Sequence, residues 1–128
     1  MMPSRPWLPI FALAFTLALS AACGGGGSAA PAADAAARGA KLYSRSGCAV
    51  CHGPNGRGDG PGAAGLTTPP RDFSQPAQFH AERTPKGLAK VIAEGSADGA
   101  MPPYQYLSDR DREDLAAFVL ALAPAPSP

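Results

Sequence analysis

One short segment constrains this chain more than any other. Cys48 and Cys51 are separated by two small residues, and His52 follows immediately. This Cys-x-x-Cys-His spacing is the one used for covalent attachment of haem. The two thiols can form thioether bonds to the vinyl groups, and the imidazole is then delivered to the iron. Because the motif occurs once, it predicts one covalently bound haem c with His52 as the proximal ligand.

Two other kinds of site contain a pair of cysteines at this spacing. A Cys-x-x-Cys segment can be a redox dithiol or half of a zinc site. A zinc site needs two further ligands, and the chain offers only Cys23 and His80, far from each other in the sequence. A thioredoxin-like dithiol needs a βαβ context, and no strand-like run precedes Cys48. The histidine in the fifth position therefore favours haem.

The amino terminus has the pattern of an export signal. A short start carries one positive charge, on Arg5, and residues 7–19 are almost entirely apolar. Small residues at positions 20–22 then offer a cleavage site. The apolar run is shorter than the roughly 20 residues that span a bilayer. We predict a signal peptide at residues 1–22 and a location in the periplasm or on a membrane facing it.

Cys23 follows this signal at once. Residues 19–23 resemble a bacterial lipoprotein box, although Ser20 stands where leucine is usual and Leu19 lies one step too early. Ordinary cleavage after Ala22 would instead leave a free thiol in an oxidising compartment, which is a liability. We predict lipidation of Cys23 and membrane association through it. The Gly-, Ala- and Pro-rich residues 23–33 then serve as a flexible linker.

The remaining chain is predicted to form one small domain, residues 34–123, followed by a Pro-rich tail at 124–128. The whole sequence has 11 Lys and Arg and 10 Asp and Glu residues. Once Arg5 leaves with the signal, the two signs balance. A neutral chain without a basic patch gives no reason to expect nucleic acid as a partner.

The first predicted helix begins at Asp34 and contains Gly39. Glycine inside a helix costs about 1 kcal/mol relative to alanine, so its presence calls for a reason. Tyr43 lies four residues later on the same face. This pair predicts a notch at Gly39, where a partner helix approaches closely, and a knob at Tyr43, which packs against that helix. The alternative is that Gly39 is merely tolerated.

A second predicted helix lies near the carboxyl end. Ser108 is a good N-cap, Asp111 follows three residues later, and Pro124 stops the helix. Four apolar residues recur at helical spacing on one face, which we expect to pack on the first helix. They are Leu115, Phe118, Val119 and Leu122.

A third predicted helix lies between these two in the sequence. Thr84 caps it, Pro85 takes the favoured first position, and Gly95 follows its end. Its apolar residues, Leu88, Val91 and Ile92, are expected to face the core. The Gly-rich residues 53–62 predict a loop without regular structure that leaves the haem-attachment turn.

Met101 is the predicted second iron ligand. With Met1 and Met2 removed in the signal, it is the only methionine of the mature chain. It lies in a loop rich in glycine and proline, so it belongs to no apolar helix stripe, and thioether ligation is the better account. The rival ligand is His80, but an isolated loop histidine is more often solvated.

Together these features resemble a class I, mono-haem bacterial c-type cytochrome. The resemblance rests on Gly39 and Tyr43, on the attachment motif, on Met101-Pro102 and on the terminal helix. It implies an all-α fold of three or more helices around one haem, with His/Met ligation. It also implies that Pro69 or Pro70 supplies a backbone carbonyl to the His52 ring. Pro70 and Tyr104 are further candidate haem contacts.

The resemblance implies electron transfer rather than enzymatic catalysis. With both axial positions filled, no substrate binds the iron, and a soft thioether in an apolar shell predicts a relatively high potential. The protein is expected to exchange electrons with redox partners, as a carrier or as an electron-entry subunit of a redox complex. The alternative is a haem enzyme or gas sensor in which Met101 leaves the iron.

Overall fold

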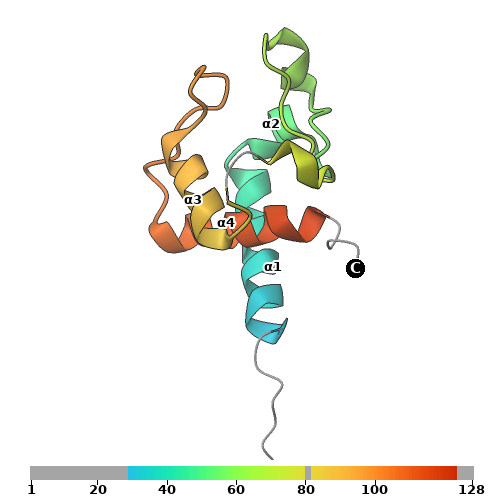
Figure 1. The fold of residues 1–128 in the computed structure, drawn as a ribbon. Coiled ribbons are helices and arrows are strands. Elements are labelled where there is room, and N and C mark those ends of the chain that lie inside the picture. Colours follow the sequence, from blue (N-terminus) through green and yellow to red (C-terminus); the bar gives the residue numbers. More distant parts are fainter. Residues whose placement is uncertain (1–28, 80–81, 124–128) are drawn as a thin grey trace, which may run out of the picture.

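The computed structural model describes residues 29–79 and 82–123, which are helical wherever they are regular (Figure 1). Four α-helices and two short 3₁₀ helices occur in these ranges, and no strand does. This confirms the predicted all-α fold. The elements are α1 (Ala29–Arg45), α2 (Cys48–His52), η1 (Pro61–Gly65), η2 (Pro76–Gln78), α3 (Pro85–Glu94) and α4 (Asp109–Leu122).

Several sequence predictions lie outside the described residues. They are the signal peptide at 1–22, lipidation of Cys23, the linker up to residue 28, the rival ligand His80 and the tail at 124–128. Among the helices that are described, none combines the length and the apolar character needed to cross a bilayer.

Helix α1 begins earlier than the sequence indicated. Its first residue is Ala29 rather than Asp34, so the prediction of a flexible linker is wrong for residues 29–33. The cause is the run of alanines, which have the strongest helix propensity of all residues. Pro31 is tolerated because it lies in the first turn, where an amide has no partner within the helix.

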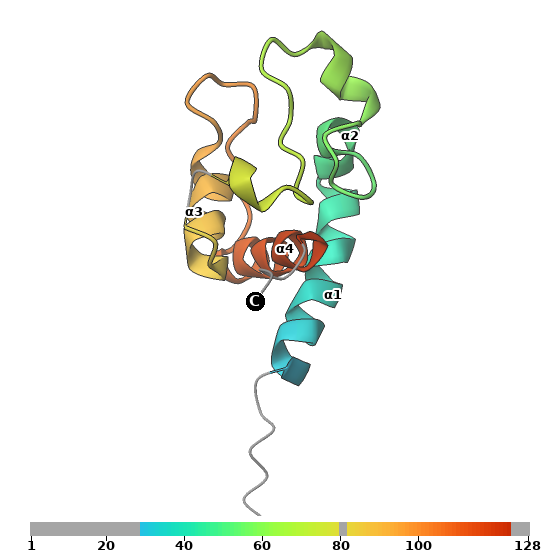
Figure 2. The same cartoon turned by 45° about the vertical axis from the view of Figure 1, so that its right-hand side comes forward.

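Helices α1 and α4 cross each other, as Figures 1 and 2 show, and they contact each other at Gly39. A Cβ added at Gly39 would overlap the backbone carbonyl of Asp114 and lie 2.8 Å from the Cβ of Phe118. The ring of Tyr43 meets that of Phe118 edge-on, with centroids 5.1 Å apart. The predicted notch and knob are therefore confirmed.

Local hydrogen bonds set the starts of α3 and α4 as predicted. Thr84 Oγ1 accepts from the backbone N–H of Gly87 at 3.0 Å, and Ser108 Oγ accepts from that of Asp111 at 3.1 Å. Each bond satisfies an amide that has no partner inside its helix. α3 also ends as expected, with Gly95 in a positive-φ conformation (75°).

The buried core lies along α4, where that helix packs against α1 and against α3. It consists of Tyr43, Phe73, Leu88, Leu115, Ala116 and Val119. Of the predicted α4 face, Leu115 and Val119 are buried, whereas Phe118 and Leu122 pack against the core from its edge. The loops that follow α2 and α3 both rise on the same side of α4, where they border the site described next (Figure 2).

Candidate haem site

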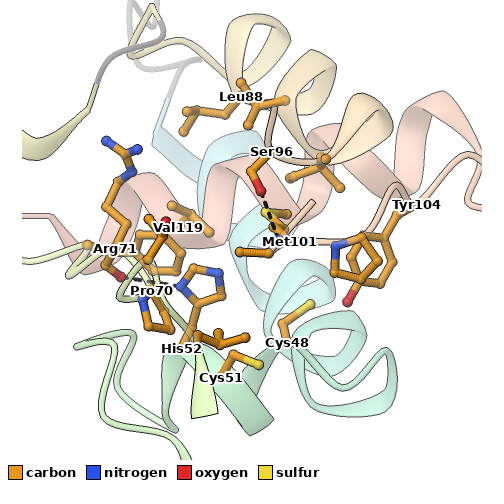
Figure 3. A pocket seen from close by; sticks show the side chains of 18 of the residues that line it. Cys48, Cys51, His52, Pro70, Arg71, Leu88, Ser96, Met101, Tyr104 and Val119 are labelled. Atoms are coloured by element: carbon orange, nitrogen blue, oxygen red, sulfur yellow. Dashed lines mark hydrogen bonds between the residues drawn. The ribbon is translucent and has the colours of Figure 1, made fainter. Parts of the chain in front are cut away.

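A cavity of about 730 Å³ lies between α2, α3, α4 and the two rising loops (Figure 3). Its volume falls within the range of about 300–1,000 Å³ that is usual for small-molecule and cofactor sites. Leucine, valine, isoleucine, proline and aromatic side chains make up most of its wall. All six candidate haem residues of the described chain line it, namely Cys48, Cys51, His52, Pro70, Met101 and Tyr104.

The attachment motif forms the short helix α2. Gly47 links it to α1 with φ at 78°, a left-handed conformation that glycine adopts without a Cβ clash. Both thiols and the imidazole line the cavity, whereas Val50 between them is 52% exposed. Burial raises the pKa of the Cys48 thiol, and a hydrogen bond with Tyr104 opposes that shift. α2 therefore presents three reactive groups to one cavity.

His52 is held in one orientation. Its Nδ1 lies 3.3 Å from the carbonyl oxygen of Arg71, and its ring stacks on Phe73 with centroids 4.6 Å apart. Burial lowers the pKa of His52, although the Arg71 carbonyl opposes that shift. Because a carbonyl can only accept, Nδ1 carries the proton. Nε2 is then left with the free lone pair that a metal ligand needs.

The partner of His52 corrects one expectation. Neither Pro69 nor Pro70 supplies the carbonyl, because that group belongs to Arg71, the next residue along. The Pro70 carbonyl instead faces Gly58, where an added Cβ would overlap it. Backbone bonds from Gly58 N to the His52 carbonyl at 2.8 Å and from Phe73 N to the Gly56 carbonyl at 2.7 Å fix these loops together. That pairing sets which carbonyl reaches the imidazole.

Met101 reaches the same cavity from the loop between α3 and α4. Figure 3 shows its side chain and that of His52 in one space, although they come from different elements. The backbone of Met101 is tied to Ser96, whose N–H donates to the Met101 carbonyl at 3.0 Å. The Met101 N–H in turn donates to Ser96 Oγ at 2.8 Å. The structure thus brings the two predicted ligands together.

These residues fit a haem. The cavity joins two thiols, a neutral imidazole with a free nitrogen and a thioether to an apolar wall, which suits a large apolar ring with iron at its centre. Within the described ranges, no cluster of three or more His, Cys, Asp or Glu residues is placed to hold a bare metal ion.

The sequence profile of the Cytochrome c family matches residues 36–123, which is most of the chain. The chain belongs to the cytochrome c family. A cytochrome c domain holds haem c covalently and transfers electrons through its iron, which is the chemistry that the cavity residues suit.

A solved structure shows the same arrangement of helices. It is a chain of the reducing HAO-like protein complex of Kuenenia stuttgartiensis, 30% identical to this cytochrome with a TM-score of 0.63. The similarity covers 71% of this chain and 44% of that chain, so the cytochrome spans less than half of its relative's length. No curated protein matches the sequence.

Tyr104 lines the wall of the cytochrome cavity beside Cys48. Burial is the main cause that raises the pKa of Tyr104 to about 12, and the nearby Cys48 adds to the shift. The Tyr104 hydroxyl therefore stays protonated at neutral pH. Its ring lies 5.8 Å from that of Tyr106, which is 74% exposed. Arg112 donates to the Tyr104 carbonyl at 3.3 Å and anchors this segment to α4. A contact between Tyr104 and haem remains a prediction.

Sequence reasoning missed four residues of the cytochrome site: Arg71, Phe73, Ser96 and Asp98. The Ser96–Gly99 segment carries a recognisable turn signal, because Asp followed by Gly favours a turn with side-chain bonds to the backbone. Arg71 and Phe73 carry no such local signal, because their roles depend on where a long loop meets α2. Hydrogen bonds with Ser96, Thr68 and the backbone of Ala100 lower the pKa of Asp98 to about 2.

Proposed function

We propose that this cytochrome carries single electrons through one haem c, held by thioether bonds to Cys48 and Cys51 and ligated by His52 and Met101. One observation supports this most directly. Two thiols, an imidazole and a thioether from separate parts of the chain line a single apolar cavity. That combination matches the attachment and axial groups of a mono-haem class I cytochrome.

Each of these residues has a separate task. The two cysteines would anchor the group, and the Arg71 carbonyl and the Phe73 ring orient His52, whose Nε2 would ligate the iron. Met101 supplies a soft donor that favours ferrous iron. The apolar wall excludes water and disfavours the extra positive charge of ferric iron, so a relatively high potential is expected. When bound, the haem supplies the one-electron couple.

The proposed setting is the periplasmic face of a membrane. A signal peptide at residues 1–22 and lipidation of Cys23 would export the domain and tether it there. A tether keeps the domain near membrane-bound redox proteins, which are its proposed electron donors and acceptors. The structural relative comes from a protein complex, which supports a role as an electron-entry subunit as well as a carrier.

Partners are proposed to meet the protein at the attachment edge. Val50, between the two cysteines, is 52% exposed, so the surface over α2 is open to another protein. Electron-transfer encounters use small, weak interfaces. Because the mature chain is close to neutral, little long-range electrostatic steering of partners is expected.

The absorption spectrum of the matured protein tests the proposal. Acidified acetone should leave the pigment on the chain, because thioether bonds are covalent. The oxidised protein should show a weak band near the red end that reports iron–sulfur coordination. Met101→Ala should abolish this band, whereas Val91→Ala, which alters another cavity-lining residue, should retain it.

Carbon monoxide separates electron transfer from the alternative. A reduced protein with both axial positions filled should bind carbon monoxide slowly at neutral pH, and Met101→Ala should bind it readily. Ready binding by the unaltered protein would instead indicate a haem enzyme or gas sensor in which Met101 leaves the iron. A pigment extractable by acidified acetone would refute covalent attachment.

A further inference from the structure

We propose that Ser96, backed by Asp98, is a positioning residue that keeps the Met101 loop closed over the cavity and so keeps the thioether on the iron. The inference rests on the proposed function, because it takes Met101 as the sixth ligand. It adds the device that holds this ligand in place. Hydrogen bonds within the loop between α3 and α4 support this role.

Ser96 forms hydrogen bonds with both the carbonyl and the N–H of Met101. Its backbone N–H donates to the Met101 carbonyl at 3.0 Å, and its hydroxyl oxygen accepts from the Met101 N–H at 2.8 Å. Figure 3 shows the second of these bonds beside the cavity. Both peptide groups that flank the Met101 Cα are therefore tied to one residue. The point from which the Met101 side chain starts is fixed relative to the end of α3.

Asp98 fixes the direction of the Ser96 hydroxyl. Its Oδ1 accepts from Ser96 Oγ at 2.5 Å and from the Ala100 N–H at 3.1 Å. A serine hydroxyl has one proton, so donating it to Asp98 leaves the oxygen lone pairs for the Met101 N–H. A charged acceptor also strengthens such a bond. Asp98 therefore orients the Ser96 hydroxyl so that its oxygen accepts a hydrogen bond from the Met101 N–H.

Burial alone does not hold this loop. Ala97, Asp98 and Gly99 are all exposed and lie outside the apolar core, although Ala97 and Asp98 border the cavity. Methionine has three rotatable bonds and adapts to many positions, so its own side chain does not fix the sulfur. Segments with few buried contacts open locally at low cost in free energy. The Ser96 hydrogen bonds are thus the direct restraints on the backbone of Met101.

The chain offers a matched control at the start of α4. Ser108 Oγ accepts from the Asp111 N–H at 3.1 Å and donates to Asp111 Oδ2 at 2.7 Å. This is the same Ser–Asp chemistry on a segment that does not line the cavity. Ser108→Ala should lower global stability without selectively freeing Met101.

The experiment compares wild type, Ser96→Ala, Ser96→Thr and Ser108→Ala as matured, haem-loaded proteins. Two quantities are measured: the rate of carbon monoxide binding to the reduced form, and the urea concentration at which the iron–sulfur band disappears, alongside far-ultraviolet circular dichroism. Ser96→Ala should bind carbon monoxide roughly two- to tenfold faster, the range that one net hydrogen bond supports. Its band should disappear before the helices unfold. Ser96→Thr should restore both properties because it keeps the hydroxyl.

Two results would overturn the inference while leaving Met101 as the ligand. One is a Ser96→Ala protein with the wild-type binding rate and a band that disappears only with global unfolding. The other is an equal acceleration in Ser108→Ala, which would indicate general destabilisation. If the unaltered protein has no iron–sulfur band and Met101→Ala changes nothing, the ligation proposal itself is wrong and this inference falls with it.

Discussion

The Tyr43 hydroxyl donates a buried hydrogen bond of 2.7 Å to the carbonyl oxygen of Gly53. Tyr43 belongs to α1 and packs edge-on against Phe118 of α4, whereas Gly53 is the residue directly after His52. One side chain therefore links the crossing of the two long helices to the end of the attachment helix. The position of His52 is coupled in this way to the packing of α1 on α4.

Tyr43→Phe is expected to destabilise the fold. The ring packing remains, but the buried Gly53 carbonyl loses its partner, at a cost of about 1–3 kcal/mol in the free energy of unfolding. Urea unfolding followed by circular dichroism measures this change. Tyr106→Phe is the control, since Tyr106 is 74% exposed and such surface changes stay within about 0.5 kcal/mol. Equal stability of the two variants would show that the Tyr43 hydroxyl contributes nothing.

Gly39→Ala is expected to destabilise the protein although alanine favours helices. Alanine gains about 1 kcal/mol over glycine in helix propensity. The new methyl group, however, would overlap the Asp114 carbonyl, so α1 and α4 must move apart. Overpacking of this kind costs about 1–3 kcal/mol or more.

Thermal unfolding of Gly39→Ala and a control separates the two effects. Gly65→Ala is suited to this comparison, because an added Cβ there meets nothing within 4 Å. We expect a lower melting temperature for Gly39→Ala and little change for Gly65→Ala. A Gly39→Ala protein more stable than wild type would mean that the helices do not approach closely at this position.

Local chemistry explains what could be predicted from the sequence. The side chains of Thr84 and Ser108 each accept a hydrogen bond from a backbone N–H three residues away. The caps of α3 and α4 can therefore be predicted without knowledge of the fold. Gly39 and Tyr43 were also informative, because a costly glycine beside an aromatic residue on one helix face signals close contact. The early start of α1 has no such local signal, because the Gly- and Pro-containing segment before Asp34 has the composition of a linker.

Long-range geometry explains what could not be predicted. Which carbonyl reaches His52 depends on how residues 53–60 pair with residues 70–73, and no spacing rule encodes that pairing. The choice of Arg71 over Pro69 or Pro70 is a difference of one or two residues in loop register. The stacking of Phe73 on His52 depends on the same register.

Asp98 is expected to contribute stability that depends on pH. Its pKa in the folded protein, about 2, lies below the unfolded value of about 3.9. The ionised form is thus favoured by folding. The contribution is present above the unfolded pKa and is lost as the pH falls through the folded pKa.

Urea unfolding of wild type and Asp98→Asn at pH 6 and pH 3 checks this sign. Wild type should be the more stable protein at pH 6. The difference in the free energy of unfolding between the two proteins should be smaller at pH 3, where the carboxyl of the unfolded chain already binds a proton. Glu113→Gln, a change at an exposed carboxylate of α4, serves as the comparison. A difference that stays constant between the two pH values would contradict the expectation.

Phe73 is expected to affect both stability and potential, because it is buried and stacks on His52. Phe73→Ala should cost about 3–5 kcal/mol in the free energy of unfolding, as is usual for truncation of a buried phenylalanine. It should also lower the midpoint potential, since water that enters beside the imidazole stabilises the extra charge of ferric iron.

A redox titration of Phe73→Ala beside Phe118→Ala distinguishes a site effect from a packing effect. Phe118 packs on Tyr43 at the crossing of α1 and α4 and does not line the cavity. Its truncation should therefore reduce stability while leaving the potential close to that of wild type. Equal shifts of potential in the two variants would mean that the potential follows overall packing, and that the apolar contact of Phe73 with the imidazole has no separate influence.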